Sequence, residues 1–507
     1  MTDSVSFPSN DDAGRARNIV QGMGLLTLQN LATSLLGFVF LFVIIRWVPL
    51  FQYGVYSAVL VIVSIATTIA GMGVNLAATR FVALHGGGDD DKSWDAARKI
   101  LLLSLLLTGV TTAFLLVISP LLSLYFVKNT AWTWAFLMGG GWVFSASIAN
   151  TFMGILQGLK RYSQLAKVLF FSRLAMTALT VALLYFFRTI ELPFLGWIFF
   201  YVCISLWIFS LIGKNMLESK GDYKYSTIIR YSLPLGIAAI IAIFATSSDS
   251  VVVGGYLNPV SLGIYQAAIS VSTVLGVVAV TPLSTALFPE ISSAKTSSDI
   301  SNGVRLTFRF ATFVVLPTSL FVVGVSTQLL SLFASGEKAY LAGTFTLELI
   351  ALFYVFVAIQ TVLLVLLQAI GKTLEVILVG VVTATTDIGV ALLLVPHFGL
   401  AGAVTSRVAV SLDGAAVTMY LSRKYMGKLD KPGFYFRSIF SSFVPSALIF
   451  LLSTFFSSRL LTLVPYAVLF FVIYLACVKV LHLVTQEDRT YLAHTLPGRL
   501  RKFADYL

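Results

Sequence analysis

Apolar runs long enough to cross a lipid bilayer recur along almost the whole chain, separated by short polar breaks. A helix of about 20 apolar residues crosses about 30 Å of hydrocarbon with every backbone group hydrogen-bonded inside the segment. The 507-residue chain is 58% hydrophobic and only 11% charged, so it carries more apolar surface than one soluble core could bury. We therefore predict an all-α integral membrane protein with about 14 transmembrane helices.

The polar breaks divide the apolar runs into two sets of six and a final pair. The first set is placed near residues 19–45, 56–80, 98–126, 131–156, 164–187 and 192–216. The second set is placed near 230–254, 260–286, 306–333, 342–369, 373–395 and 400–422, and the final pair near 438–457 and 461–483. We expect an N-terminal lobe over residues 1–220, a second lobe over 221–430, and two further helices with a tail over 431–507.

The positive charges predict how this bundle is oriented. With the N-terminus placed inside, 28 of the 34 Lys and Arg residues fall on the cytoplasmic side, five fall outside, and Arg407 falls within a span. Lys and Arg collect in short cytoplasmic loops of membrane proteins, so we expect a multi-pass protein of the cytoplasmic membrane with both termini in the cytoplasm. The net charge of +12 follows from this topology. Because the basic residues form no continuous patch, we expect no nucleic-acid partner.

Similar segments occur at equivalent places in the two six-helix halves. The segment Gln52 to Ala58 resembles Ser261 to Ala267 at an offset of 209 residues, with Tyr56 matching Tyr265. The segment Ile155 to Gly158 resembles Leu366 to Ala369 at an offset of 211. Because both halves start on the same side, these matches predict a parallel repeat. Two six-helix lobes around a central cavity would suit transport by alternating access.

Several of these segments together resemble a known family. They are Tyr53 to Tyr56, Leu156 to Arg161, Ser232 to Asp249, Pro282 to Ser292, Leu367 to Lys372 and Pro396 to Val404. Their order and spacing resemble the polysaccharide and oligosaccharide-lipid flippases of the multidrug/oligosaccharidyl-lipid/polysaccharide exporter superfamily. The resemblance covers most of the chain, from about Arg17 to Lys479. Members of that family are typically built from two six-helix lobes and two C-terminal helices.

The resemblance implies that the protein moves a polyprenyl-linked glycan from the cytoplasmic to the outer leaflet and makes or breaks no bond. A sugar head group cannot cross hydrocarbon unaided, because each unsatisfied polar group there costs several kcal/mol. A polar cavity would accept the head group while the polyprenyl tail stays among the membrane lipids. The enzymes that assemble the glycan are the expected protein partners.

Buried charges within the spans are candidates for ion coupling. Asp249 lies inside the seventh span and Asp387 inside the eleventh, so a proton or a sodium ion could drive transport by neutralising one of them. Arg407 in the twelfth span could reach Asp387 or Glu348 on a neighbouring helix. The alternative is a buried ion pair that only holds the helices together.

Substrate binding requires cationic and amide donors, because a glycan carrier ends in phosphate and arginine binds phosphate oxygens bidentately. The candidates near the cytoplasmic mouth are Arg80, Arg173, Arg305, Arg309 and Arg407. The amide candidates for binding sugars are Asn30, Asn75, Asn150 and Gln360. The alternatives are arginines that only obey the positive-inside rule and amides that only join helices.

Two other function classes compete with the flippase hypothesis. A cation-coupled multidrug exporter of the same superfamily would also have two six-helix lobes. A membrane-embedded glycosyltransferase or polymerase would need acidic catalytic residues in sizeable loops, and the predicted loops are short. The sequence has no Walker A motif, no metal-ligand spacing and no defensible Ser/His/Asp set, and its two cysteines lie far apart. We therefore expect a transporter that is not an enzyme, without a metal or a cofactor other than a coupling ion.

Overall fold

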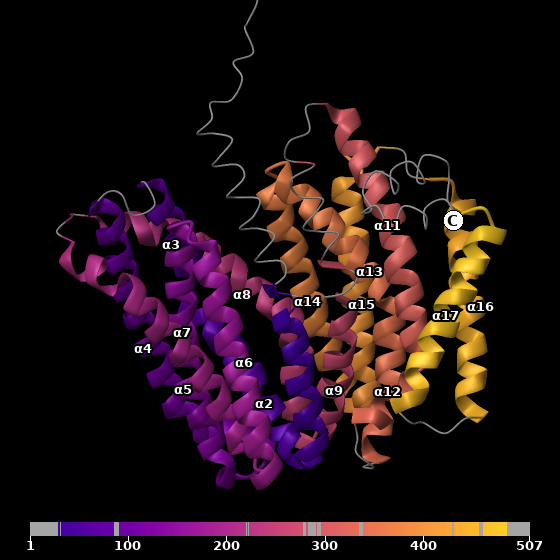
Figure 1. The fold of residues 1–507 in the computed structure, drawn as a ribbon, viewed down its shortest axis with the longest axis horizontal. Helices are drawn as coiled ribbons and strands as arrows, with labels where there is room; N and C mark the ends of the chain where they lie inside the picture. Colours follow the sequence, from indigo (N-terminus) through magenta and orange to yellow (C-terminus); the bar gives the residue numbers. More distant parts are fainter. Residues whose placement is uncertain are drawn as a thin grey trace, which may run out of the picture. The chain divides into compact units, whose positions relative to one another are not determined.

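The computed structural model describes residues 29–30, 32–85, 91–219, 221, 223–276, 280–281, 291, 296–333, 338–427, 430–455 and 460–483. Within these residues every regular element is a helix (Figure 1). The chain divides into two compact units, Met1–Ile243 and Phe244–Leu507, and the boundary falls inside helix α8. The start of the predicted first span, most of the Pro282 to Ser292 segment and the predicted tail lie outside the described residues.

Unit 1 consists of long apolar helices joined by short turns. Its elements are Ala32–Trp47, α2 (Leu50–Gly71), α3 (Val74–Leu84), α4 (Asp91–Val127), η2 (Thr130–Trp132), α5 (Thr133–Gly158), α6 (Tyr162–Phe187), α7 (Glu191–Glu218) and the first part of α8 (Tyr225–Tyr256). The predicted boundary near residue 220 falls in the connection between α7 and α8.

Unit 2 also consists of apolar helices, and it includes the last two predicted spans. Its elements are the rest of α8, α9 (Pro259–Leu275), α11 (Ser297–Gly324), α12 (Ser326–Phe333), η4 (Lys338–Gly343), α13 (Thr344–Ala369), α14 (Thr373–Phe398), α15 (Leu400–Ser422), α16 (Pro432–Phe455) and α17 (Leu460–Val480). Helix α16 packs on α11 and α17, so the two C-terminal helices belong to this unit. The three-part division at residues 220 and 430 stays a prediction.

The structure confirms an all-helical membrane protein. Eleven helices in the described residues are long and apolar enough to cross a membrane, and Ala32–Trp47 is a shorter apolar helix. Large apolar side chains such as Val117, Phe186 and Phe455 lie exposed on these helices, as expected for surfaces that face lipid. Two further predicted spans correspond to α5 and α9, so each of the 14 predicted spans has a helix at its position in the described residues.

Helix α5 is the central helix of unit 1. Because other helices surround it and not lipid, it can carry polar and small residues. It contacts α2, α3, α4, α6 and α7 (Figure 1). Glycines let these neighbours approach closely: a Cβ at Gly139 would lie 2.8 Å from Val59, and one at Gly154 would lie 2.4 Å from the carbonyl oxygen of Asn75. Such close contact replaces the hydrophobic drive that a membrane interior lacks.

The predicted second span is two helices. Helix α2 ends at Gly71 and α3 begins at Val74, with Met72 and Gly73 between them in left-handed conformations. Gly73 has φ of 73°, and a Cβ there would lie 2.5 Å from the carbonyl oxygen of Ser232 on α8. Both the backbone angle and the close contact therefore favour glycine at this position.

The sequence repeat has a local structural counterpart at the ends of α5 and α13. After α5, the N–H of Arg161 donates to the carbonyl of Leu156 and the N–H of Lys160 donates to that of Gln157. After α13, Lys372 and Gly371 make the same two bonds to Leu367 and Gln368. Lys160 and Gly371 both have positive φ, so each helix ends in the same left-handed cap at the predicted offset of 211 residues.

Candidate functional site

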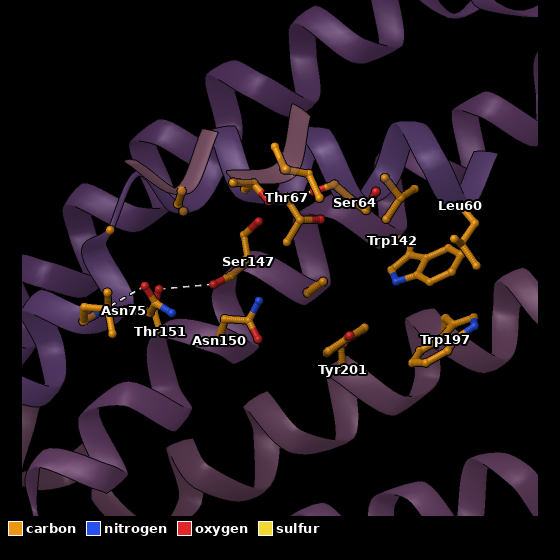
Figure 2. Close-up of a pocket in the computed structure, with 18 of the residues that line it drawn as sticks. Leu60, Ser64, Thr67, Asn75, Trp142, Ser147, Asn150, Thr151, Trp197 and Tyr201 are labelled. Atoms are coloured by element: carbon orange, nitrogen blue, oxygen red, sulfur yellow. Dashed lines mark hydrogen bonds between the residues drawn. The ribbon is translucent and has the colours of Figure 1, made fainter. Parts of the chain in front are cut away.

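Unit 1 contains a cavity of about 540 Å³, bounded by α2, α3, α5, α7 and α8. None of the described residues that line it is charged; they are glycines and residues with aliphatic, aromatic, hydroxyl or amide side chains. The α2–α3 break contributes Gly71, Gly73 and Asn75. Figure 2 shows Trp142 and Trp197 at one end of this cavity and Asn75 at the other.

Three aromatic residues form one wall of the cavity. The rings of Trp142 and Trp197 stack with centroids 5.1 Å apart and an interplanar angle of 14°. Tyr201 stacks on Trp197 at 5.9 Å. The Trp197 indole N–H donates a 2.9 Å hydrogen bond to the hydroxyl of the buried Tyr56, which fixes the orientation of the indole ring. Flat aromatic faces with a fixed orientation are well suited to pack against the apolar face of a sugar ring.

The polar part of the lining is formed by the predicted amides and by neighbouring hydroxyls. The Asn75 side-chain oxygen accepts the N–H of Leu76 at 2.9 Å, so its amide N–H groups are not used by that bond. The Asn150 amide makes no hydrogen bond with another described residue and lines the cavity (Figure 2). The buried Thr151 hydroxyl lies 3.1 Å from the carbonyl oxygen of Ser147, to which it donates, and 2.7 Å from the hydroxyl of Ser104 on α4.

Arg173 lies behind this wall. Its guanidinium carbon is 4.5 Å from the centroid of Trp197 and 5.6 Å from those of Phe40 and Phe200, and Nη1 is 3.5 Å from the sulfur of Met176. Within the described residues no carboxylate pairs with it. The count of 28 cytoplasmic Lys and Arg residues includes Arg173. The structure places Arg173 in the middle of α6, so this residue is no evidence for the side on which a loop lies.

The remaining candidates of unit 1 lie outside this cavity. Arg80 is exposed, with its guanidinium carbon 4.4 Å from the ring centroid of Tyr231. Asn30 is exposed, and its carbonyl oxygen accepts a bond from the Ser34 hydroxyl. Asn75 and Asn150 are therefore the only two of the predicted candidates among the residues described as lining the cavity.

In unit 2 the structure brings the two predicted carboxylates together with Arg407. The Asp249 backbone N–H donates to Asp387 Oδ2 at 3.1 Å, and both side chains are fully buried. Arg407 Nε lies 3.1 Å from Asp249 Oδ2. The predicted partners of Arg407 were Asp387 and Glu348; the ion pair is instead with Asp249, while Glu348 accepts a bond from Ser326 at 2.7 Å.

Hydroxyl groups complete this charged cluster. Tyr265 donates to Asp249 Oδ2 at 2.6 Å, Ser250 donates to Asp249 Oδ1 at 3.1 Å, and Ser406 donates to Asp387 Oδ1 at 2.9 Å. These donors replace part of the hydration that buried carboxylates lose. The cluster holds two carboxyl groups and one guanidinium, which pairs with Asp249 alone of the two, so it has room for one more positive charge.

Arg407 also lines a second cavity, of about 380 Å³, within unit 2. Its side chain is 22% exposed there, and Nη1 donates to the carbonyl of Thr246 at 2.9 Å. The other polar side chains of the lining are Thr246, Ser272, Thr273, Tyr354 and Ser411. Gln360 lies against Gly414 between α13 and α15 and does not line this cavity.

Arg305 and Arg309 share one carboxylate. Arg305 Nε lies 2.9 Å from Asp430 Oδ1, and Arg309 Nε lies 3.2 Å from Asp430 Oδ2. The Arg309 guanidinium also stacks on Phe434 at 5.0 Å. The predicted placement of the two arginines on one helical face is confirmed, and their common partner ties α11 to the segment before α16.

The residues that sequence reasoning missed are the aromatic wall, Tyr265, Ser406 and Asp430. The sequence repeat aligns Tyr56 with Tyr265, and this match is the feature that could have identified the two tyrosines as part of the sites. Trp142 and Trp197 are single aromatic residues in apolar runs that contain many others, so their position in the sequence did not distinguish them.

Two family models match the sequence. The family described as polysaccharide biosynthesis protein matches residues 19–295, and the one described as lipid II flippase MurJ matches residues 233–477. No curated protein matches the sequence.

Solved transporter structures share the fold. The lipid II flippase MurJ in an inward closed conformation aligns with a TM-score of 0.74 at 14% identity, over 89% of this chain and 98% of that chain. An inward-facing multidrug resistance MATE family transporter of the MOP superfamily aligns with a TM-score of 0.64 at 16% identity, over 81% and 94%. A MOP superfamily transporter from Pyrococcus furiosus aligns with a TM-score of 0.52 at 18% identity, over 85% and 94%. At these identities the likeness establishes a common fold.

Proposed function

This chain belongs to the polysaccharide biosynthesis protein family, and we propose that it flips a lipid-linked oligosaccharide or polysaccharide repeat unit across the membrane by alternating access. The direction is from the cytoplasmic to the outer leaflet of the cytoplasmic membrane, with both termini in the cytoplasm. The transport step makes and breaks no covalent bond. The substrate is a polyprenyl-linked glycan, and its assembly enzymes act before the flippase.

The observation that carries this proposal is the uncharged cavity of unit 1. A glycan presents hydroxyl groups that need hydrogen-bond partners and ring faces that pack against aromatic surfaces. The cavity offers both, with the Asn75 and Asn150 amides on one side and the stacked Trp142 and Trp197 rings on the other. Its volume lies within the range usual for small-molecule sites.

The competing function is export of small drugs. This alternative is considered because a multidrug resistance MATE family transporter shares the fold. A cationic drug would be favoured by a carboxylate that lines the cavity. Neither described cavity has one in its lining, and the unit 2 cavity presents the cation Arg407. These linings therefore favour a neutral or anionic substrate.

For coupling, we propose that a proton or a sodium ion binds at Asp249 and Asp387. The support is the charge count of the cluster: it holds two fully buried carboxyl groups and one guanidinium, which pairs with Asp249 alone of the two. Asp249→Asn and Asp387→Asn should remove the dependence of transport on the ion gradient. Asp413→Asn is the matched control, since Asp413 is bound by Thr386 and lines neither cavity.

The flippase proposal is tested with purified full-length protein in proteoliposomes that contain a fluorescent polyprenyl-diphosphate glycan. We expect the wild type to move the glycan between leaflets and Asn150→Leu to lower the rate at least about tenfold, through loss of the proposed hydrogen bonds from the Asn150 amide to the glycan. Ser145→Ala is the control, because Ser145 lies on the same helix but donates to its own backbone. Vesicles that extrude a cationic dye and move no glycan would favour the exporter instead.

A further inference from the structure

We propose that the unit 2 cavity binds an oxyanion through Arg407, and that Asp249 controls its affinity by competing for the same guanidinium. The inference rests on the proposed function for the origin of the anion, which would be a phosphate of the lipid carrier or a carboxylate of an acidic sugar. All the described residues that line the site belong to unit 2.

The first observation is the way in which Arg407 is held. Asp249 pairs with Nε, and the carbonyl of Thr246 accepts from Nη1, so these contacts use two of the three guanidinium nitrogens. Nη2 makes no hydrogen bond with any residue that the structure describes. Because the side chain is partly exposed and lines the cavity, its remaining N–H groups can reach a ligand there. A guanidinium binds oxyanions by paired N–H donors.

The second observation is the pattern of donors and acceptors around Arg407. The hydroxyls of Ser272, Thr273 and Ser411 donate to backbone carbonyls of their own helices, so toward the cavity they present acceptor lone pairs. The Tyr354 hydroxyl donates to no other described residue and lines the same cavity. Arg407 and Tyr354 are therefore the donors for an anion, and the three hydroxyls can accept from neighbouring sugar groups.

The third observation is the excess of negative charge behind Arg407. Asp387 contacts the backbone of Asp249, and the two carboxyl groups outnumber the single guanidinium. An anion that binds Arg407 must share the guanidinium with Asp249 and must also approach these charges, which weakens its binding. Neutralising Asp249 removes the competition for the guanidinium and part of the repulsion, and Asp387 keeps its charge. Because linkage is reciprocal, a cation that neutralises the pair during transport would strengthen the anion site in the same way.

The test is calorimetric titration of the purified full chain in nanodiscs with inorganic diphosphate, and separately with glucuronate. We expect Asp249→Asn to bind one of these anions at least about tenfold more tightly than the wild type, and Arg407→Gln to lose binding. Tyr354→Phe should weaken binding severalfold while keeping the ring in place. Asp413→Asn is the control and should match the wild type. Preference for diphosphate assigns the site to the carrier, and preference for glucuronate assigns it to an acidic sugar.

Equal binding by Arg407→Gln and the wild type would overturn the proposal, as would an Asp249→Asn protein that binds neither anion. Thermal unfolding of each variant identifies one that has failed to fold. In that case the Tyr354→Phe variant decides: weaker anion binding than the wild type supports the site, and unchanged binding overturns it. The proposed function can fail separately: a protein that binds diphosphate in this pattern but moves no glycan in proteoliposomes keeps the anion site and loses the flippase assignment.

Discussion

The indole N–H of Trp197 and the hydroxyl of Tyr56 form a 2.9 Å hydrogen bond that joins α7 to α2 beside the unit 1 cavity. In the sequence repeat Tyr56 matches Tyr265, whose hydroxyl donates to Asp249 at 2.6 Å. Both tyrosines are buried near the start of a helix: α2 is preceded by Pro49, and α9 begins at Pro259. The same position of the repeat thus supports an uncharged aromatic wall in one unit and a buried charged cluster in the other.

Trp197→Phe should weaken glycan binding and destabilise unit 1. The change keeps an aromatic ring but leaves the buried Tyr56 hydroxyl without its donor, which costs about 1–3 kcal/mol. Thermal unfolding and affinity for the glycolipid measure the two effects. Trp207→Phe is the control, because Trp207 lies on the same helix with 40% of its surface exposed. Equal effects of the two changes would argue against a special role for Trp197.

Gly154→Ala should destabilise the packing of α5 on α3. The added Cβ would lie 2.4 Å from the Asn75 carbonyl oxygen, a backbone atom that cannot move alone, so we expect a loss of about 1–3 kcal/mol. Gly109→Ala is the matched control, since no described atom beyond its own turns of helix backbone lies within 4 Å of its Cβ position. That variant should be neutral or slightly stabilising through helix propensity. A Gly154→Ala protein with wild-type stability would contradict the close contact.

Arg309→Gln should destabilise the protein more than Arg305→Gln. Both arginines pair with Asp430, but the Arg309 side chain is 6% exposed and the Arg305 side chain 42% exposed. Loss of a buried partner costs about 3–5 kcal/mol, and an exposed pair contributes about 0–1 kcal/mol. Denaturation midpoints of the two variants give the comparison. The reverse order would show that the cluster is held mainly through Arg305.

Arg173→Leu should raise thermal stability and lower the rate of glycan transport. Among the described residues Arg173 has aromatic and sulfur contacts but no carboxylate, and a cation at membrane depth costs about 2.5–3.5 kcal/mol. Removing the charge should relieve that cost and release the Trp197 ring that it packs against. Arg80→Leu is the control, because Arg80 is exposed. Lower stability in Arg173→Leu would mean that its ring contacts outweigh the cost of burial.

The candidate site was predicted in part from residue chemistry. Polar groups in apolar runs are costly, so the sequence singled out Asn75, Asn150, Asp249, Asp387 and Arg407, and the structure gathers these into two clusters. Their partners could not be predicted. Arg407 pairs with an aspartate 158 residues away in the sequence, because contacts across helices depend on the rotation of each helix about its axis and on its crossing angle.

The sequence by itself determined the membrane fold, because the length of each apolar run and the need to satisfy every backbone group leave only helices at these positions. It also determined the repeat of the segments that end α5 and α13, where the structure then shows the same local cap. Only the tertiary structure decided that α5 lies at the centre of unit 1, that Trp142 stacks on Trp197, and that Asp249 holds Arg407. Those relationships arise where separate helices pack together, and local patterns of residues do not specify such contacts.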